Sequence, residues 1–190
     1  MGEADRRIRA AFEAVSREDF LPEDQVANAA LDRALPIGYH QTSSQPRTVL
    51  NMLLLLGVEE GQRVLDVGSG SGWTTGLLGH LAGPSGRVMG VELVPELVAW
   101  SRENLAGYLM PWASIHQARE GELGLPDEAP FDRILVSAEA IELPKTLVDQ
   151  LAYGGLMVVP VAGRMLSIER RSATEVVQHR HGHYSFVPLR

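Results

Sequence analysis

The sequence predicts an α/β protein with a doubly wound, mostly parallel sheet and an antiparallel C-terminal edge. Short apolar runs alternate with helical stretches from residue 63 onward, which is typical of a parallel sheet covered on both faces. A glycine-rich turn joins the first of these strands to its helix. The last strand-like runs have no helices between them, which indicates antiparallel pairing at the edge.

The N-terminal part is predicted to hold two helices separated by a long irregular segment. Apolar residues at helical spacing between Ile8 and Val15 predict the first helix. Residues 22–46 are rich in Pro, Gly, Ser and Thr, and so long a loop in a small domain is usually functional or a lid. Pro46 can begin the second helix and Gly57 can end it.

The remaining elements follow from apolar periodicity. The predicted parallel strands are Val64–Val67, Val88–Val91, Ser114–His116, Ile134–Val136 and Leu156–Val161. The predicted helices between them are Trp73–Leu81, Pro95–Leu105 and Pro144–Tyr153. After Gly163, the predicted antiparallel edge strands are Met165–Glu169, Glu175–His179 and Tyr184–Val187.

Length and composition narrow the function classes. The 190 residues suit one domain, with residues 1–57 supplying helices and a binding loop and residues 58–190 supplying the sheet. A net charge of −7 argues against nucleic acid as a partner. The chain has no cysteine, which excludes disulfides and thiolate metal sites, and its apolar runs are far too short for a membrane span. We expect a cytoplasmic protein, with a monomer favoured.

The most informative segment is the glycine turn, residues 68–72, which follows the strand ending in Asp66-Val67. Gly68, Gly70 and Gly72 let the backbone bend sharply and approach a ligand closely. A dinucleotide site would need a third glycine where Trp73 stands, and a phosphate-binding P-loop would need a lysine. The turn resembles the cofactor loop of Rossmann-like methyltransferases, whose ligand carries no phosphate.

Glu92 ends the next predicted strand, about 20 residues after the glycine turn, at the spacing of a ribose-binding acid. Its carboxylate can accept hydrogen bonds from both ribose hydroxyls. The alternative is that the glycines only make a tight turn and that Glu92 is a solvated strand end. The two features together favour the cofactor interpretation.

Several segments, in order along almost the whole chain, resemble the protein-L-isoaspartate O-methyltransferase family. The most specific is the loop Leu35–Pro46, which contains the serine loop, residues 42–45. The others are Arg17–Pro22, the turn at 66–72, Ala129–Ile134, Leu151–Gly155 and Phe186–Leu189. The resemblance implies a class I methyltransferase fold and S-adenosyl-L-methionine as the methyl donor. It also implies repair of damaged protein by methylation of L-isoaspartyl carboxylates.

The resemblance also implies site residues. Ser44 matches the active-site serine of the family, so we expect it to be the catalytic residue. The expected donor contacts are Thr42, Ser43, Gln45, Asp66, Gly68, Ser69, Gly70, Gly72, Glu92, Leu93, Glu120 and Gly121. On residue types alone, an ordinary polar turn that caps the following helix is the favoured interpretation of the serine loop, and the family resemblance reverses that preference.

The chemistry fits such a loop. A carboxylate acceptor has an ordinary pKa of about 4 and is ionised at neutral pH, so it needs no general base. The enzyme has only to position and desolvate the two reactants. The Ser44 hydroxyl can donate a hydrogen bond to the carboxylate, and Thr42 can assist.

Four residues depart from the family pattern: His40, Ser43, Glu120 and Glu139. Glu139 interrupts a run of alanines, and a negative charge there would repel a carboxylate substrate. These departures keep open a relative that methylates aspartyl or isoaspartyl groups of a dedicated peptide. A non-catalytic module that binds S-adenosylmethionine also stays open, whereas the loop spacing disfavours a nucleotide-dependent oxidoreductase.

A metal site has weak support. His179, His181 and His183 alternate and would share one face of a strand. No carboxylate lies between them, so we expect no metal cofactor.

Overall fold

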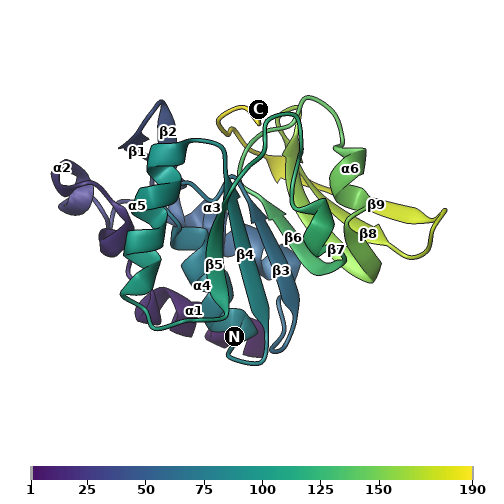
Figure 1. Cartoon of the computed structure of the whole chain (residues 1–190), viewed down its shortest axis with the longest axis horizontal. Helices are drawn as coiled ribbons and strands as arrows, with labels where there is room; N and C mark the ends of the chain where they lie inside the picture. Colours follow the sequence, from purple (N-terminus) through teal and green to yellow (C-terminus); the bar gives the residue numbers. More distant parts are fainter. Residues whose placement is uncertain (1, 190) are drawn as a thin grey trace.

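A computed structural model describes residues 2–189 and places seven strands in one sheet, in the order β5-β4-β3-β6-β7-β8-β9 (Figure 1). Strands β5 to β7 in this order pair in parallel, and β8 and β9 extend the edge in antiparallel pairing, as predicted. The bounds are β3 (Arg63–Val67), β4 (Arg87–Glu92), β5 (Ala113–Gln117), β6 (Phe131–Val136), β7 (Leu151–Val161), β8 (Arg164–Arg170) and β9 (Val176–His183).

Helices α3 and α5 begin, and α3 ends, where the sequence signals predict. Pro46 and Pro95 stand at the starts of α3 and α5, and Gly57 ends α3 with a left-handed φ of 57°. The longer helices are α1 (Glu3–Ala14), α3 (Pro46–Leu56), α4 (Trp73–Ala82) and α5 (Pro95–Ala106). The short ones are η1 (Arg17–Phe20), α2 (Glu23–Val26), η2 (Pro126–Glu128) and α6 (Lys145–Val148).

The core lies on both faces of the sheet because neighbouring residues of a strand point to opposite sides. In β3, Val64 packs with Leu53 of α3 and Leu77 of α4, whereas Leu65 belongs to a second cluster with Leu147 of α6. All five of these side chains are completely buried. β3, which leads into the glycine turn, is therefore held by packing on both of its faces.

The prediction of an irregular segment over residues 22–46 is only partly right. It contains the short helix α2 and a two-stranded hairpin of β1 (Leu35–Gly38) and β2 (Gln41–Ser43). The hairpin turns through positive φ at Gly38, Tyr39 and His40. Because two of these residues are not glycine, the sequence carries no strong turn signal at this place.

The predicted helix Pro144–Tyr153 is too long. Helix α6 ends at Val148, and β7 begins at Leu151, which pairs with the buried Phe131 of β6. The apolar residues of this stretch satisfy the spacing of a helix and of a buried strand equally well. Pairing with β6 decides between them.

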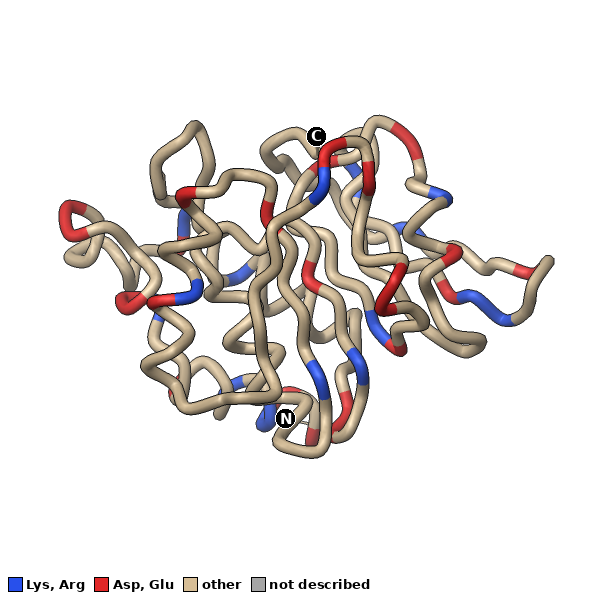
Figure 2. Tube along the Cα trace, in the orientation of Figure 1, with Lys and Arg blue, Asp and Glu red and all other residues tan. Residues whose placement is uncertain are grey.

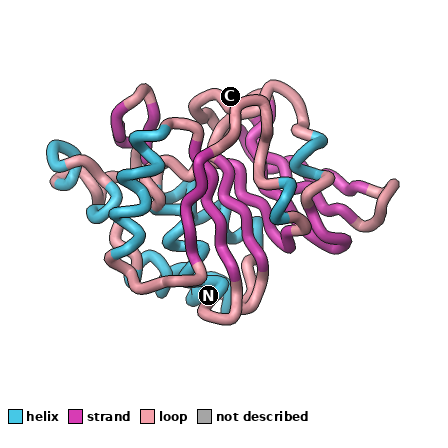
Figure 3. The backbone as a smooth tube through the Cα atoms, viewed as in Figure 1, coloured by secondary structure: helices cyan, strands magenta, loops and turns pink. Residues whose placement is uncertain are grey.

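The predicted strand Tyr184–Val187 is wrong, and the preceding strand is longer than predicted. Strand β9 continues to His183, and the chain then leaves the sheet. The Glu139 N–H donates to the Val187 carbonyl at 2.8 Å. This bond connects the C-terminal segment, residues 184–189, to the loop that follows β6. Figure 3 shows this segment among the loops at the upper end of the sheet, at the opposite pole from the N-terminus.

Within residues 2–189, no helix has the length and apolar character that a membrane crossing requires.

Candidate active site

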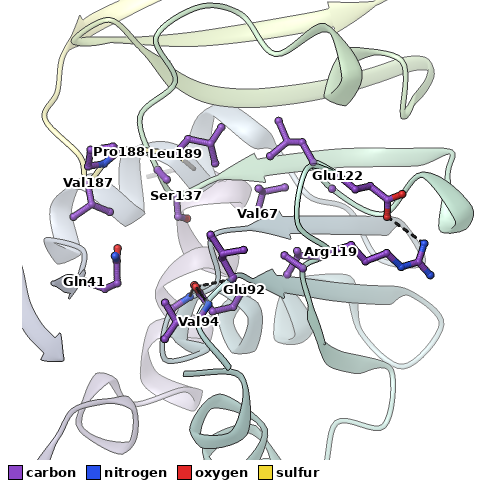
Figure 4. A pocket seen from close by; sticks show the side chains of 18 of the residues that line it. Gln41, Val67, Glu92, Val94, Arg119, Glu122, Ser137, Val187, Pro188 and Leu189 are labelled. Atoms are coloured by element: carbon purple, nitrogen blue, oxygen red, sulfur yellow. Dashed lines mark hydrogen bonds and ion pairs between the residues drawn. The ribbon is translucent and has the colours of Figure 1, made fainter. Parts of the chain in front are cut away.

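A cavity of about 560 Å³ opens at the carboxyl ends of β3, β4, β5 and β6. Ligands of open α/β sheets bind at this end of the strands. Figure 4 shows Glu92 and Val94 on one side of the cavity, Val187 to Leu189 on the other, and Ser137 between them. The wall is formed by the hairpin, three strand ends, residues 118–124 and residues 187–189.

Glu92 is a buried wall residue with a fixed orientation. One carboxylate oxygen accepts a hydrogen bond from the Gly70 N–H at 2.9 Å. The other accepts from the N–H groups of Leu93 and Val94 at 2.7 and 2.9 Å. A carboxylate offers about four lone-pair positions, so roughly one remains for a ligand. The alternative that Glu92 is a solvated strand end is wrong, since the side chain is only 7% exposed.

Asp66 lies behind the glycine turn and does not line the cavity. Its Oδ2 accepts hydrogen bonds from the Thr74 and Thr75 hydroxyls at 2.6 and 2.7 Å, which fixes the first turn of α4. Its Oδ1 is buried and has no partner. Burial raises the pKa of Asp66 to about 6, and the two threonine hydrogen bonds oppose that rise.

The glycine turn faces the serine loop. A smaller cavity of about 30 Å³ lies between them and is lined on one side by Thr42, Ser43 and Ser44. The opposite side is formed by residues 68–71 together with Ser137. The Ser69 hydroxyl is buried without a hydrogen-bond partner, so this part of the site has an unused polar group.

A buried arginine holds the serine loop. The Arg17 guanidinium donates to the carbonyls of Ser43 and Ser44 at 3.1 and 2.9 Å, and Nε donates to the Ser43 hydroxyl at 3.2 Å. Burial lowers the pKa of Arg17 to about 10, and nearby Asp32 opposes the shift. The guanidinium therefore remains charged at neutral pH.

The charged side chains in the cavity wall are mostly acidic. Glu92, Glu120 and Glu122 line it, and its one cationic residue among those described, Arg119, is paired with Glu122 and Asp127 at 3.2 and 2.9 Å. Figure 2 shows acidic and basic segments close together on the loops above the strand ends. Such a wall suits a ligand with net positive charge better than a pyrophosphate.

Comparison with known proteins decides the family. The family model described as protein-L-isoaspartate(D-aspartate) O-methyltransferase (PCMT) matches residues 2–190. The chain belongs to this family. The predicted resemblance is confirmed over nearly its whole length.

Individual relatives agree with this assignment. A protein-L-isoaspartate O-methyltransferase of Methanococcoides burtonii is 41% identical over 190 residues, covering 97% of this chain and 92% of its own. One from Anaeromyxobacter dehalogenans is 49% identical over 162 residues, covering 85% and 76%. A Plasmodium falciparum structure of the same family, in complex with S-adenosyl-L-homocysteine, superposes with a TM-score of 0.83 at 26% identity, covering 97% and 90%. The Rossmann-like class I methyltransferase fold is thus confirmed.

In this family member, the structure brings most of the predicted site residues to the two cavities. Those that line one or both are Thr42, Ser43, Ser44, Gly68, Ser69, Gly70, Glu92, Leu93, Glu120 and Gly121. Gln45, Gly72 and Asp66 line neither cavity. The Gln45 side chain donates to the Asp32 carbonyl at 3.0 Å, and Gly72, with a φ of 95°, packs against Ser101.

Sequence reasoning missed Ser137, Arg17 and the lining role of the C-terminal segment. Ser137 directly follows β6, so the rule that ligands bind at carboxyl strand ends was the available signal. Arg17 has no such signal, because an arginine in a polar stretch between helices is ordinarily exposed.

The sequence analysis expects Glu139 to repel a carboxylate substrate. The structure does not support this expectation, because Glu139 lines neither cavity. Its carboxylate accepts hydrogen bonds from the N–H groups of Gly163 and Phe186 at 2.9 and 3.4 Å. Its own carbonyl accepts from the Leu189 N–H at 2.8 Å. Glu139 therefore holds the C-terminal segment against the cavity.

The three alternating histidines do not gather around a metal position. His181 forms a hydrogen bond of 2.8 Å with the Ser167 hydroxyl across the β8–β9 ladder. No group of three or more His, Cys, Asp or Glu residues suitable for a metal occurs in the described part of the chain.

Proposed function

We propose that this chain transfers the methyl group of S-adenosyl-L-methionine to the free α-carboxylate of L-isoaspartyl residues in damaged proteins and peptides. One observation carries the proposal: the serine loop and the glycine turn face each other across one small cavity. A methyl acceptor bound by one loop would then lie directly opposite a donor bound by the other.

The residues present fit the donor. Its sulfonium and amino groups are positive and its carboxylate is negative, which suits the acidic wall formed by Glu92, Glu120 and Glu122. The unpartnered Ser69 hydroxyl offers a hydrogen bond beside the glycine turn, and Ser137 lines both cavities. The remaining lone-pair position on Glu92 would accept a bond from one ribose hydroxyl, where the sequence suggested two. The donor, when bound, supplies an activated methyl group with a neutral leaving group.

The chain's own residues then have to orient the acceptor and exclude water. An isoaspartyl carboxylate is already ionised at neutral pH, so no proton has to be removed. Ser44 lines the small cavity and would donate its hydroxyl hydrogen to one carboxylate oxygen, leaving the other free to attack. Alignment of two reactants supplies on the order of 7–11 kcal/mol in favourable intramolecular models.

The acceptors are proteins and peptides, and we place the reaction in the cytoplasm. The acidic chain, at net charge −7, favours such acceptors over nucleic acids, and the lack of cysteine suits a reducing compartment. An enzyme for one dedicated peptide would show turnover with that peptide alone, and a sensor module would bind the donor without turnover.

The test uses one short peptide in two versions, isoaspartyl and aspartyl, with donor labelled in its methyl group. We expect label on the isoaspartyl version and almost none on the aspartyl one. Inactivity on both, with the donor bound normally in a calorimetric titration, would reject the repair function and favour the sensor module.

Ser44→Ala should lower turnover on the isoaspartyl peptide by roughly 10- to 1,000-fold, by analogy with loss of one hydrogen-bond donor to a reacting oxygen. Donor affinity should change little, because the wall of the larger cavity is untouched. Ser172→Ala, in the turn between β8 and β9, is the control and should retain full turnover. Unchanged turnover in Ser44→Ala would remove Ser44 from its role.

A further inference from the structure

Arg17 is a buried cation with an unusually complete set of backbone partners. Only 6% of it is exposed, and its guanidinium reaches six oxygen atoms. These are the Ser43 hydroxyl and the carbonyls of Ala29, Leu31, Arg33, Ser43 and Ser44. Within residues 2–189, no carboxylate lies within ion-pair distance of it. Carbonyl dipoles therefore stabilise its charge.

The same side chain connects the two halves of the site. The guanidinium carbon lies 5.3 Å from the centre of the Trp73 ring. Trp73 is the first residue of α4 and directly follows the glycine turn, and its indole N–H donates to the Val15 carbonyl at 3.2 Å. Arg17 thus lies between the serine loop and the helix that carries the glycine turn.

We propose that Arg17 is a positioning residue for methyl transfer: it fixes the serine loop at the distance from the glycine turn at which Ser44 can orient the acceptor. This inference rests on the proposed function of Ser44. Arg17 contacts neither reactant and acts through the carbonyls of Ser43 and Ser44.

The geometry requires a guanidinium. Its five N–H groups lie in one plane, so a single side chain can reach Arg33 and Ala29 on one segment and Ser43 and Ser44 on the other. A lysine has three donors around one nitrogen and loses the flat stacking surface that faces Trp73. Arg17→Lys keeps the charge and loses the link between the segments.

The experiment compares Arg17→Lys with Arg7→Lys. Arg7 is a matched control because it also donates to two backbone carbonyls, those of Val58 and Leu81, but lies far from both cavities. For Arg17→Lys we expect a kcat loss of roughly 10- to 100-fold on the isoaspartyl peptide, since displacement by about 1 Å can cost 10²-fold. Donor affinity, measured by calorimetry, should change less than about 3-fold, and Arg7→Lys should keep its kcat.

A double-mutant cycle separates positioning from general loss of structure. If Arg17 acts through Ser44, then Arg17→Lys introduced into Ser44→Ala should lower the residual turnover by only about 3-fold or less. An equal fold loss in both backgrounds would overturn the inference, as would an equal loss in Arg7→Lys.

Hydrogen exchange provides a readout that does not depend on activity. Amides of residues 41–45 should exchange faster in Arg17→Lys than in the unmodified protein, while those of α1 keep their rates. Unchanged exchange at residues 41–45 would reject the anchoring role. If exchange is faster in Arg17→Lys but the unmodified protein has no isoaspartyl activity, the anchoring role of Arg17 stands and the proposed function is rejected. The two failures are therefore distinguishable.

Discussion

Glu92 and Asp66 lie on neighbouring strands, and their carboxylates have different surroundings. Three backbone N–H groups bind Glu92, so its direction toward the cavity is fixed before any ligand arrives. Asp66 is bound through one oxygen only, by Thr74 and Thr75, and its other oxygen has no partner. Glu92 is therefore oriented for contact with a ligand, whereas Asp66 fixes the start of α4.

Glu139 is a single residue that holds the opposite wall of the cavity in place. Its carboxylate binds the Phe186 N–H, and Val187 to Leu189 line the cavity. Glu139→Ala removes the side-chain hydrogen bonds and leaves the backbone bonds to Val187 and Leu189 in place. A typical hydrogen bond contributes about 1 kcal/mol, so we expect donor affinity to fall roughly 5-fold in a calorimetric titration. Glu142→Ala, on an exposed residue nearby, should bind the donor normally. Equal affinities in all three proteins would contradict the holding role.

At the scale of elements, β4 passes so close to the start of α4 that Gly90 has no room for a side chain. A Cβ there would lie 2.6 Å from the Thr75 hydroxyl, 2.7 Å from Ile115 and 3.1 Å from Ser69. β4, α4 and the glycine turn can therefore pack this closely only because residue 90 is a glycine.

Gly90→Ala should destabilise the protein by about 1–3 kcal/mol, the usual cost of overpacking a core, and should weaken donor binding by displacing Ser69. Urea unfolding and a donor titration measure the two effects. Gly107→Ala is the control, because Gly107 has an ordinary φ of −64° and only one atom within reach, at 3.5 Å. A wild-type unfolding midpoint for Gly90→Ala would show that the packing relaxes freely.

Sequence alone locates the bounds of β3, β4, β5, α3, α4 and α5 to within about one residue and the start of β6 to within three, because local periodicity and Pro and Gly signals decide them. Sequence alone does not locate an element whose bounds depend on pairing between residues far apart in the chain. The start of β7 is an example, because Leu151 pairs with Phe131. The site divides in the same way. Gly68, Gly70 and Glu92 follow predicted strands and were found, whereas Arg17 and the C-terminal segment reach the site only through the tertiary fold.

At the scale of the whole molecule, Asp66 makes stability depend on pH. Its pKa is raised in the folded state, so the folded protein binds this proton more tightly than the unfolded chain does. The free energy of unfolding should therefore fall as pH rises through the window from about 4 to about 6. Above that window the buried charge persists as a constant cost.

Asp66→Asn should remove this dependence. A shift of about two pKa units corresponds to roughly 3 kcal/mol, so the stability of wild type relative to Asp66→Asn should fall by about that amount between pH 4 and pH 7. Denaturant unfolding without donor measures it. Asp24→Asn, on an exposed residue, should run parallel to wild type. Parallel curves for Asp66→Asn as well would mean that Asp66 titrates alike in the folded and unfolded states.

The return of the C-terminal segment to the cavity has a practical consequence. Leu189 lines the wall of the larger cavity, so an affinity tag or fusion partner attached at this end of the chain would start close to that cavity. The N-terminus lies at the other pole of the molecule (Figure 1). Affinity tags therefore belong at that end, because a C-terminal tag would crowd the space beside the cavity.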